Sequence, residues 1–167
     1  MCRLTFSNIS NALIFASLTH CLLPTVAHAG WTDFHRKKGI GCDDSHGVFH
    51  LDARGDFNGD SKMDRAVIQY DSARIRSRLV VFLDEKNAKL PIILREWNGS
   101  PDNEYVETTP PAKEETWCGK TDECAPGDPK VITYKYESIA FGSCESSRIV
   151  YYWDPKSHRF KNVGISD

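Results

Sequence analysis

The stretch RAVIQYDSARIRSRLVVFL, residues 65–83, decides the fold class of this chain. Two runs rich in β-branched and aromatic residues, 65–70 and 78–83, flank a short polar segment. This is the pattern of two β-strands joined by a turn, because such side chains pack well on a pleated surface. The run 79–83 is apolar without a break, so it predicts a central strand that is covered on both faces.

Runs of the same kind recur along the chain, and no segment keeps a sustained helical period. The run 149–153 is again continuously apolar and predicts a second central strand, and the DPKSH that follows it is typical of a hairpin turn. Eight runs in all predict an all-β fold, a single antiparallel domain of about eight strands. Beyond the opening pair, the runs occupy residues 48–51, 91–97, 131–136, 138–143, 147–153 and 159–165.

The strand pattern fails over residues 98–130, which are polar and include five prolines. We therefore expect a long polar loop here. Loops of this length inside a compact domain are often functional, so the segment is a candidate partner surface.

The first 29 residues have the features of a signal peptide: Arg3 is followed by the apolar ALIFASL and by AHA ending at Ala29. We expect an exported protein, periplasmic or secreted, with one domain over residues 30–167. A lipoprotein anchored at Cys21 is the weaker alternative, because His20 stands where a small residue is required. No other stretch approaches the roughly 20 apolar residues of a membrane span.

The formal net charge of −2 gives no reason to expect nucleic acid as a partner.

Four cysteines follow the predicted signal peptide, and an even number in an exported chain favours two disulfides. Cys118 and Cys124 enclose only five residues, so they form the pair with the least costly loop closure. Cys42 and Cys144 would then join the start of the domain to its end. A zinc site is the competing interpretation, but the chain has no CxxC pair. The spacing favours this connectivity without excluding the others.

The segment GDFNGDSKMD, residues 55–64, places oxygen-bearing side chains on alternate residues. This is the spacing of an EF-hand-like calcium loop, because Ca²⁺ takes about six to eight hard oxygen ligands and a coiled backbone turns alternate side chains inward. Ser61 stands where such a loop normally has glycine, and Val67 where a helix-loop-helix site has glutamate. The predicted Ca²⁺ ligands are the side chains of Asp56, Asn58, Asp60 and Asp64 and the main-chain carbonyl of Lys62.

The longer stretch GDFNGDSKMDRAVI, residues 55–68, resembles the calcium loop of FG-GAP or VCBS-type repeats. In those repeats the loop leads directly into a strand, and the position of Asp64 supplies the closing carboxylate. The chain departs from that family at Ser61 and at Arg65, where glycine and an apolar residue are usual. The repeats form a propeller from several copies, and this chain has one copy, so a full propeller is excluded.

The layout as a whole, with ESSRIVYYWDPKSHRFKNVGISD at residues 145–167, resembles small bacterial periplasmic proteins that are remotely similar to lysozyme inhibitors and immunity proteins. This resemblance implies a protein that works by binding, with a peptidoglycan hydrolase as its partner. The Ser-Gly-x-x-Tyr motif of lysozyme inhibitors is absent from the sequence, as are GxSxG, HExxH and P-loop motifs, and no catalytic residue is predicted. An FG-GAP-like adhesion or envelope structural module is the alternative, and a hydrolase is third.

Overall fold

The computed structural model describes residues 30–35, 50–88, 90–121, 124–144 and 146–166. These residues form eleven strands and one short helix. The elements are β1 (Thr32–Asp33), β2 (Asp52–Gly55), β3 (Asp64–Asp71), β4 (Arg76–Phe82), β5 (Ile92–Asn98), β6 (Glu104–Thr109), β7 (Lys113–Glu115), α1 (Trp117–Thr121), β8 (Val131–Thr133), β9 (Ser138–Ser143), β10 (Arg148–Asp154) and β11 (Arg159–Ser166).

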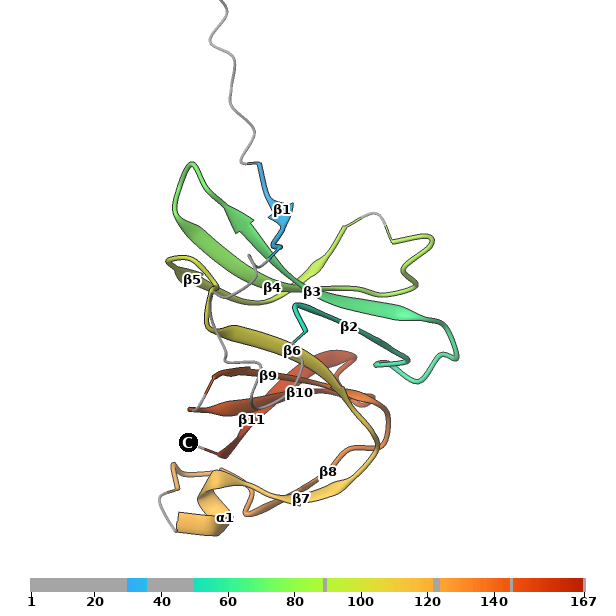
Figure 1. Cartoon of the computed structure of the whole chain (residues 1–167). Coiled ribbons are helices and arrows are strands. Elements are labelled where there is room, and N and C mark those ends of the chain that lie inside the picture. The colour runs from blue at the N-terminus through green and yellow to red at the C-terminus, as the bar shows by residue number, and fades with distance from the viewer. Residues whose placement is uncertain (1–29, 36–49, 89, 122–123, 145, 167) are drawn as a thin grey trace, which may run out of the picture.

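The strands form three antiparallel sheets that lie in layers (Figure 1). The first sheet has the order β1–β3–β4–β5, and β2 pairs with the start of β3. The second sheet has the order β11–β10–β9–β6, and β7 and β8 form a separate hairpin. The second sheet is therefore the middle layer, with the first sheet on one side and the hairpin on the other (Figure 1).

The main core lies between the first and second sheets. Ile68 on β3 and Leu79 on β4 are directly paired and have no exposed surface. Ile139 on β9 is equally buried and belongs to the same cluster, as does Phe57 from the loop between β2 and β3. Because alternate residues of a strand share one face, each strand contributes every second side chain to this core.

The other face of the second sheet is covered by the β7–β8 hairpin. Val150 on β10 packs there with Tyr134, whose hydroxyl donates a hydrogen bond of 2.9 Å to Glu114 Oε2. Arg148 Nη1 donates to the other Glu114 oxygen at 3.2 Å. Burial and the Glu114 charge raise the pKa of Tyr134. The middle sheet is thus enclosed on both faces, which accounts for the unbroken apolar run at residues 149–153.

The all-β class and the antiparallel arrangement predicted from the sequence are confirmed, and β4 and β10 are central strands as expected. The number of strands is eleven, because β1, β6 and β7 add to the eight expected runs. Residues 48 and 49 of the first run lie outside the described residues; residues 50 and 51 are not in a strand, and the strand of this region is β2, at residues 52–55. The sequence missed β1 and β7 because strands of two and three residues are too short to show a period.

Residues 98–130 are not a loop throughout, because they contain β6, β7 and α1. In β6 only Val106 and Thr109 are buried, so this polar strand lacks the apolar run that marks the others.

The predicted Cys118–Cys124 disulfide is confirmed. Cys42 and residues 1–29 lie outside the described residues, so the Cys42–Cys144 pairing and the signal peptide stay predictions. Among the described residues, no helix has the length and apolar character to cross a membrane.

Candidate functional site

The loop between β2 and β3 coils around the carboxylate of Asp56. Its Oδ1 accepts hydrogen bonds from the backbone N–H groups of Gly59 at 2.8 Å and Asp60 at 3.0 Å. Its Oδ2 accepts the N–H of Ser61 at 2.8 Å. Three consecutive N–H groups therefore point at the first predicted calcium ligand, and the loop has the tight coil that the motif requires.

Two residues of the coil have left-handed backbone conformations. Gly59 has φ of 78° and Ser61 has φ of 64°. Ser61 occupies the position at which such loops normally have glycine, and a serine in this conformation is strained. Gly59 packs so closely on the ring of Tyr136 that a Cβ atom at this position would collide with it.

The other predicted side-chain ligands are held in local turns or in the core. Asn58 Oδ1 accepts the N–H of Asp60 at 3.0 Å, and Asp60 Oδ1 accepts the N–H of Lys62 at 2.9 Å. Asp64 is fully buried, and its two oxygens accept the N–H of Phe57 at 2.9 Å and the N–H of Asp84 at 2.8 Å. Asp64 thus joins the loop, β3 and the segment after β4.

The loop is electrostatically unbalanced. Burial raises the pKa of Asp64, and the negative charges of Asp60 and Asp56 raise it further. The amino group of Lys62 binds Asp84 at 3.0 Å instead of these carboxylates.

Within the described residues, no three His, Cys, Asp or Glu side chains are arranged to hold a metal ion. Asp56 Oδ2, Asp60 Oδ1 and both Asp64 oxygens nevertheless accept one backbone N–H group each and keep a second lone pair, and the hard-oxygen set suits Ca²⁺.

The loop is fixed against the second sheet, and together with β2 and β6 it forms what we call the closed flank. Asp56 N–H donates to Glu137 Oε2 at 2.7 Å. Val106 N–H donates to the carbonyl of His50 at 2.8 Å, and Thr108 Oγ1 donates to the carbonyl of Arg54 at 2.8 Å. Hydrogen bonds therefore connect the two large sheets on this side.

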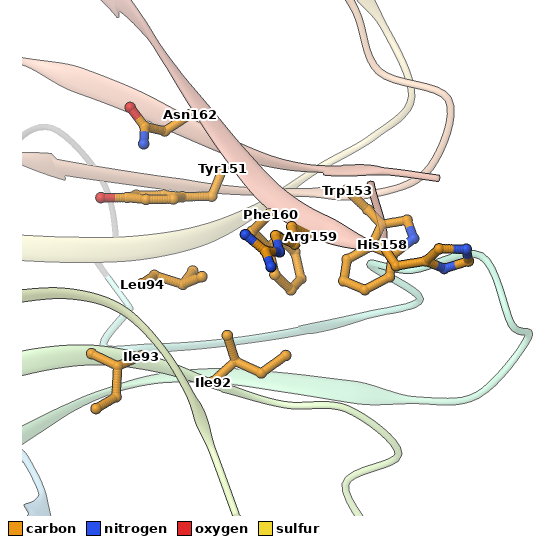
Figure 2. A pocket seen from close by; sticks show the side chains of 9 residues that line it. All are labelled: Ile92, Ile93, Leu94, Tyr151, Trp153, His158, Arg159, Phe160 and Asn162. Atoms are coloured by element: carbon orange, nitrogen blue, oxygen red, sulfur yellow. The ribbon is translucent and has the colours of Figure 1, made fainter. Parts of the chain in front are cut away.

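The opposite side lies between β5 and β11, the edge strands of the two large sheets, and we call it the open seam. A cavity of about 370 Å³ occupies it. The side chains of Ile92 and Leu94 face aromatic rings from β10 and β11 across this cavity (Figure 2). Its lining residues are Ile92, Ile93, Leu94, Tyr151, Trp153, His158, Arg159, Phe160 and Asn162.

The open seam carries positive charge next to apolar surface. Arg159 is exposed at its rim, and the guanidinium of Arg95 lies 5.4 Å from the ring centre of Phe141. Across the part of the chain that the structure describes, Arg95 and Arg159 form no ion pair with a carboxylate. Such a combination of charge and apolar area suits a ligand with both properties.

The sequence did not indicate the open seam. The pattern PIILREW at residues 91–97 predicted a strand, but an edge position depends on which strands pair. Tyr151 and Trp153 both line the cavity, and Tyr151 also belongs to the buried core. The only signal for an exposed strand in this run was that two isoleucines, Ile92 and Ile93, are followed by charged residues.

Comparison with protein-family models, with curated proteins and with solved structures gave no match.

Proposed function

We propose that this chain is an exported, calcium-stabilised β domain that works by binding, and that it inhibits a cell-wall hydrolase or gives immunity to one. The observation that carries the proposal is the open seam, where cationic and apolar side chains gather at one edge of the molecule. Hydrolases that cleave glycans use a pair of carboxylates in a cleft. A cationic projection beside apolar surface is complementary to such a cleft.

The projection is the connection between β10 and β11. Lys156, His158 and Arg159 are exposed there. Asp154 fixes the turn, because its carboxylate accepts the Lys156 N–H at 3.0 Å and the Ser157 hydroxyl at 2.8 Å. A turn that is ordered before binding loses little conformational entropy when a partner closes around it.

Calcium has a structural role in this proposal. An ion held by Asp56, Asn58, Asp60, Asp64 and the carbonyl of Lys62 would offset the repulsion between the loop carboxylates. Because the loop is also bonded to Glu137, the ion would stabilise the contact between the two large sheets. An affinity on the order of 10⁻⁴ to 10⁻³ M, typical of extracellular modules, is sufficient outside the cytosol.

The test is to immobilise the purified protein, pass envelope extract and a purified muramidase over it, and measure muramidase activity with and without the protein. We expect retention of the muramidase and loss of its activity. The double variant Lys156→Glu and Arg159→Glu should lose both effects. The control is Lys113→Glu, a charge reversal on exposed β7, which should keep them.

Other outcomes select the alternatives. Retention of glycan alone selects an FG-GAP-like adhesion or envelope module. Release of peptidoglycan fragments by the protein alone selects a hydrolase.

A further inference from the structure

The two large sheets resemble a barrel that is connected on one side and open on the other. At the closed flank, hydrogen bonds run from β6 to His50 and to Arg54 on β2. At the open seam, β5 pairs only with β4 and β11 only with β10, as far as the described residues extend. Each of these edge strands has one side that pairs with no other described strand, and both strands line the same cavity.

The free edge of β11 is its first half. Helix α1 covers the second half, because Lys120 Nζ donates to the carbonyl of Ile165 at 2.8 Å and Trp117 lies close to Gly164. Arg159, Phe160 and Asn162 in the first half instead line the cavity. Over residues 159–163 β11 pairs with β10 without a register shift, so its outer edge continues a regular ladder.

The opposite wall of the cavity is apolar and irregular. On β5 a bulge makes Leu94 an extra residue, because Leu79 pairs with Arg95 and Val80 with Ile93. Bulges interrupt a ladder and redirect side chains, so β5 is a poor template for a further strand. Its exposed Ile92 and Ile93, at 38% and 50%, instead offer apolar surface across from β11.

We propose that the open seam binds an extended segment of a partner polypeptide, which adds as a strand to the free edge of β11. The segment carries alternating apolar side chains that pack on Ile92 and Leu94, and a carboxylate that pairs with Arg159. This inference rests on the proposed function, since it specifies how the partner protein is held. Main-chain hydrogen bonds provide the affinity in this mode of recognition, and alternate side chains provide the specificity.

Charge and ring geometry favour a peptide over a glycan. Arg159 and Arg95 have no carboxylate partner within the residues described, and an acidic side chain would supply one. Glycans bind by stacking on flat aromatic faces. Trp153 packs edge-to-face with Phe160, at 5.2 Å and 72°, and with His158, at 6.3 Å and 75°. These rings are therefore not laid out as a flat platform.

The direct test is amide hydrogen exchange of the purified protein with a synthetic peptide of about ten residues, in which valine alternates with threonine and glutamate. We expect slower exchange at residues 159–163, where new backbone hydrogen bonds form. The matched control is the same peptide with N-methyl groups on alternate residues, prepared in both registers. One of the two registers should abolish the protection, because it removes the donors that face β11. Equal protection by both methylated peptides overturns strand addition.

Side-chain variants test the two walls of the open seam. Arg159→Glu and Ile92→Asp should each weaken binding of the peptide at least tenfold. Lys113→Glu and Val131→Asp are the matched controls, because they make the same kinds of change at exposed positions of the β7–β8 hairpin. Unchanged binding by Arg159→Glu or Ile92→Asp, or an equal loss in the controls, overturns the inference.

The outcomes separate this inference from the proposed function. Inhibition of a muramidase without protection of residues 159–163 overturns strand addition but supports the proposed inhibitor function. Peptide binding with that protection, but without retention of any hydrolase, keeps strand addition and overturns the hydrolase partner. Protection by a tetramer of N-acetylglucosamine in place of the peptide overturns the polypeptide occupant.

Discussion

The closed flank and the open seam use polar residues in opposite ways. At the closed flank, the oxygens of Asp56 and Asp64 accept five N–H groups of the chain itself, and Glu137 accepts another from the opposite sheet. At the open seam, Arg95 and Arg159 have no carboxylate partner within the residues described, and two isoleucines are exposed. Substitutions at the closed flank should therefore change stability, whereas those at the open seam should change binding.

The largest expected effect is that of Asp64→Ala at the closed flank. The substitution leaves the N–H groups of Phe57 and Asp84 without an acceptor in a buried site, and each costs about 1–3 kcal/mol. We expect a loss of about 3 kcal/mol in the free energy of unfolding, measured with urea in the presence of chelator. Asp60→Ala is the control, because Asp60 is exposed and should lose less than about 1 kcal/mol. Equal losses in the two variants would contradict the anchoring role of Asp64.

Calcium should produce the next largest effect. For an affinity of about 10⁻⁴ to 10⁻³ M, roughly 10 mM calcium adds about 1.4–2.7 kcal/mol to the free energy of unfolding. Thermal unfolding with chelator, with calcium and with magnesium measures this difference. Asp56→Asn should reduce the calcium effect, since it removes the charge of the first ligand. An unfolding temperature that stays constant across millimolar calcium would exclude the site.

Ser61→Gly should stabilise the closed flank. Ser61 has φ of 64°, a conformation that costs a residue with a side chain about 1 kcal/mol more than glycine. Because Ser61 is exposed, the substitution removes no packing, and we expect a gain of up to about 1 kcal/mol in chelator. Ser72→Gly, at an exposed position with ordinary φ, is the control and should not stabilise. A loss of stability on Ser61→Gly would show that the strain argument is wrong.

Sequence reasoning succeeded where the signal is local. Spacing alone located the loop at residues 55–64, and Ser61, which stands where such loops normally have glycine, does adopt the left-handed conformation that favours glycine. The partner of Asp64 was not predictable in this way. Asp84 lies 20 residues away, and the two meet only because β3 and β4 pair in one particular register. The motif assigned Asp64 to an ion, and this assignment stays a prediction; the structure adds that Asp64 is a buried acceptor of two N–H groups.

The open seam could not be predicted for a related reason. The sequence locates strands at residues 91–97 and 159–165, but it contains no signal that these two become the edges of different sheets. Strand order follows from contacts between distant segments, and β6, which closes the second sheet on its other side, was missed because it is polar. The sequence predicted a strand at residues 91–97, and only the pairing, over the residues that the structure describes, shows which side of β5 is an edge.

The smallest expected effect concerns the turn at the rim of the open seam. The amino group of Lys161 lies 2.7 Å from the Asp154 carboxylate and, with Ser157 and the Lys156 N–H, lowers the pKa of Asp154 to about 2 from 3.8. Because Asp154 binds a proton more weakly in the folded state than in the unfolded state, its interactions stabilise the fold above about pH 4. This stabilisation is lost as the pH falls towards 2. Carboxyl chemical shifts measured by NMR should place the midpoint of Asp154 near 2, and Lys161→Met should raise it. A midpoint near 3.8 in both proteins would mean that the turn is not held by this carboxylate, and the ordered projection beside Arg159 would lose its physical basis.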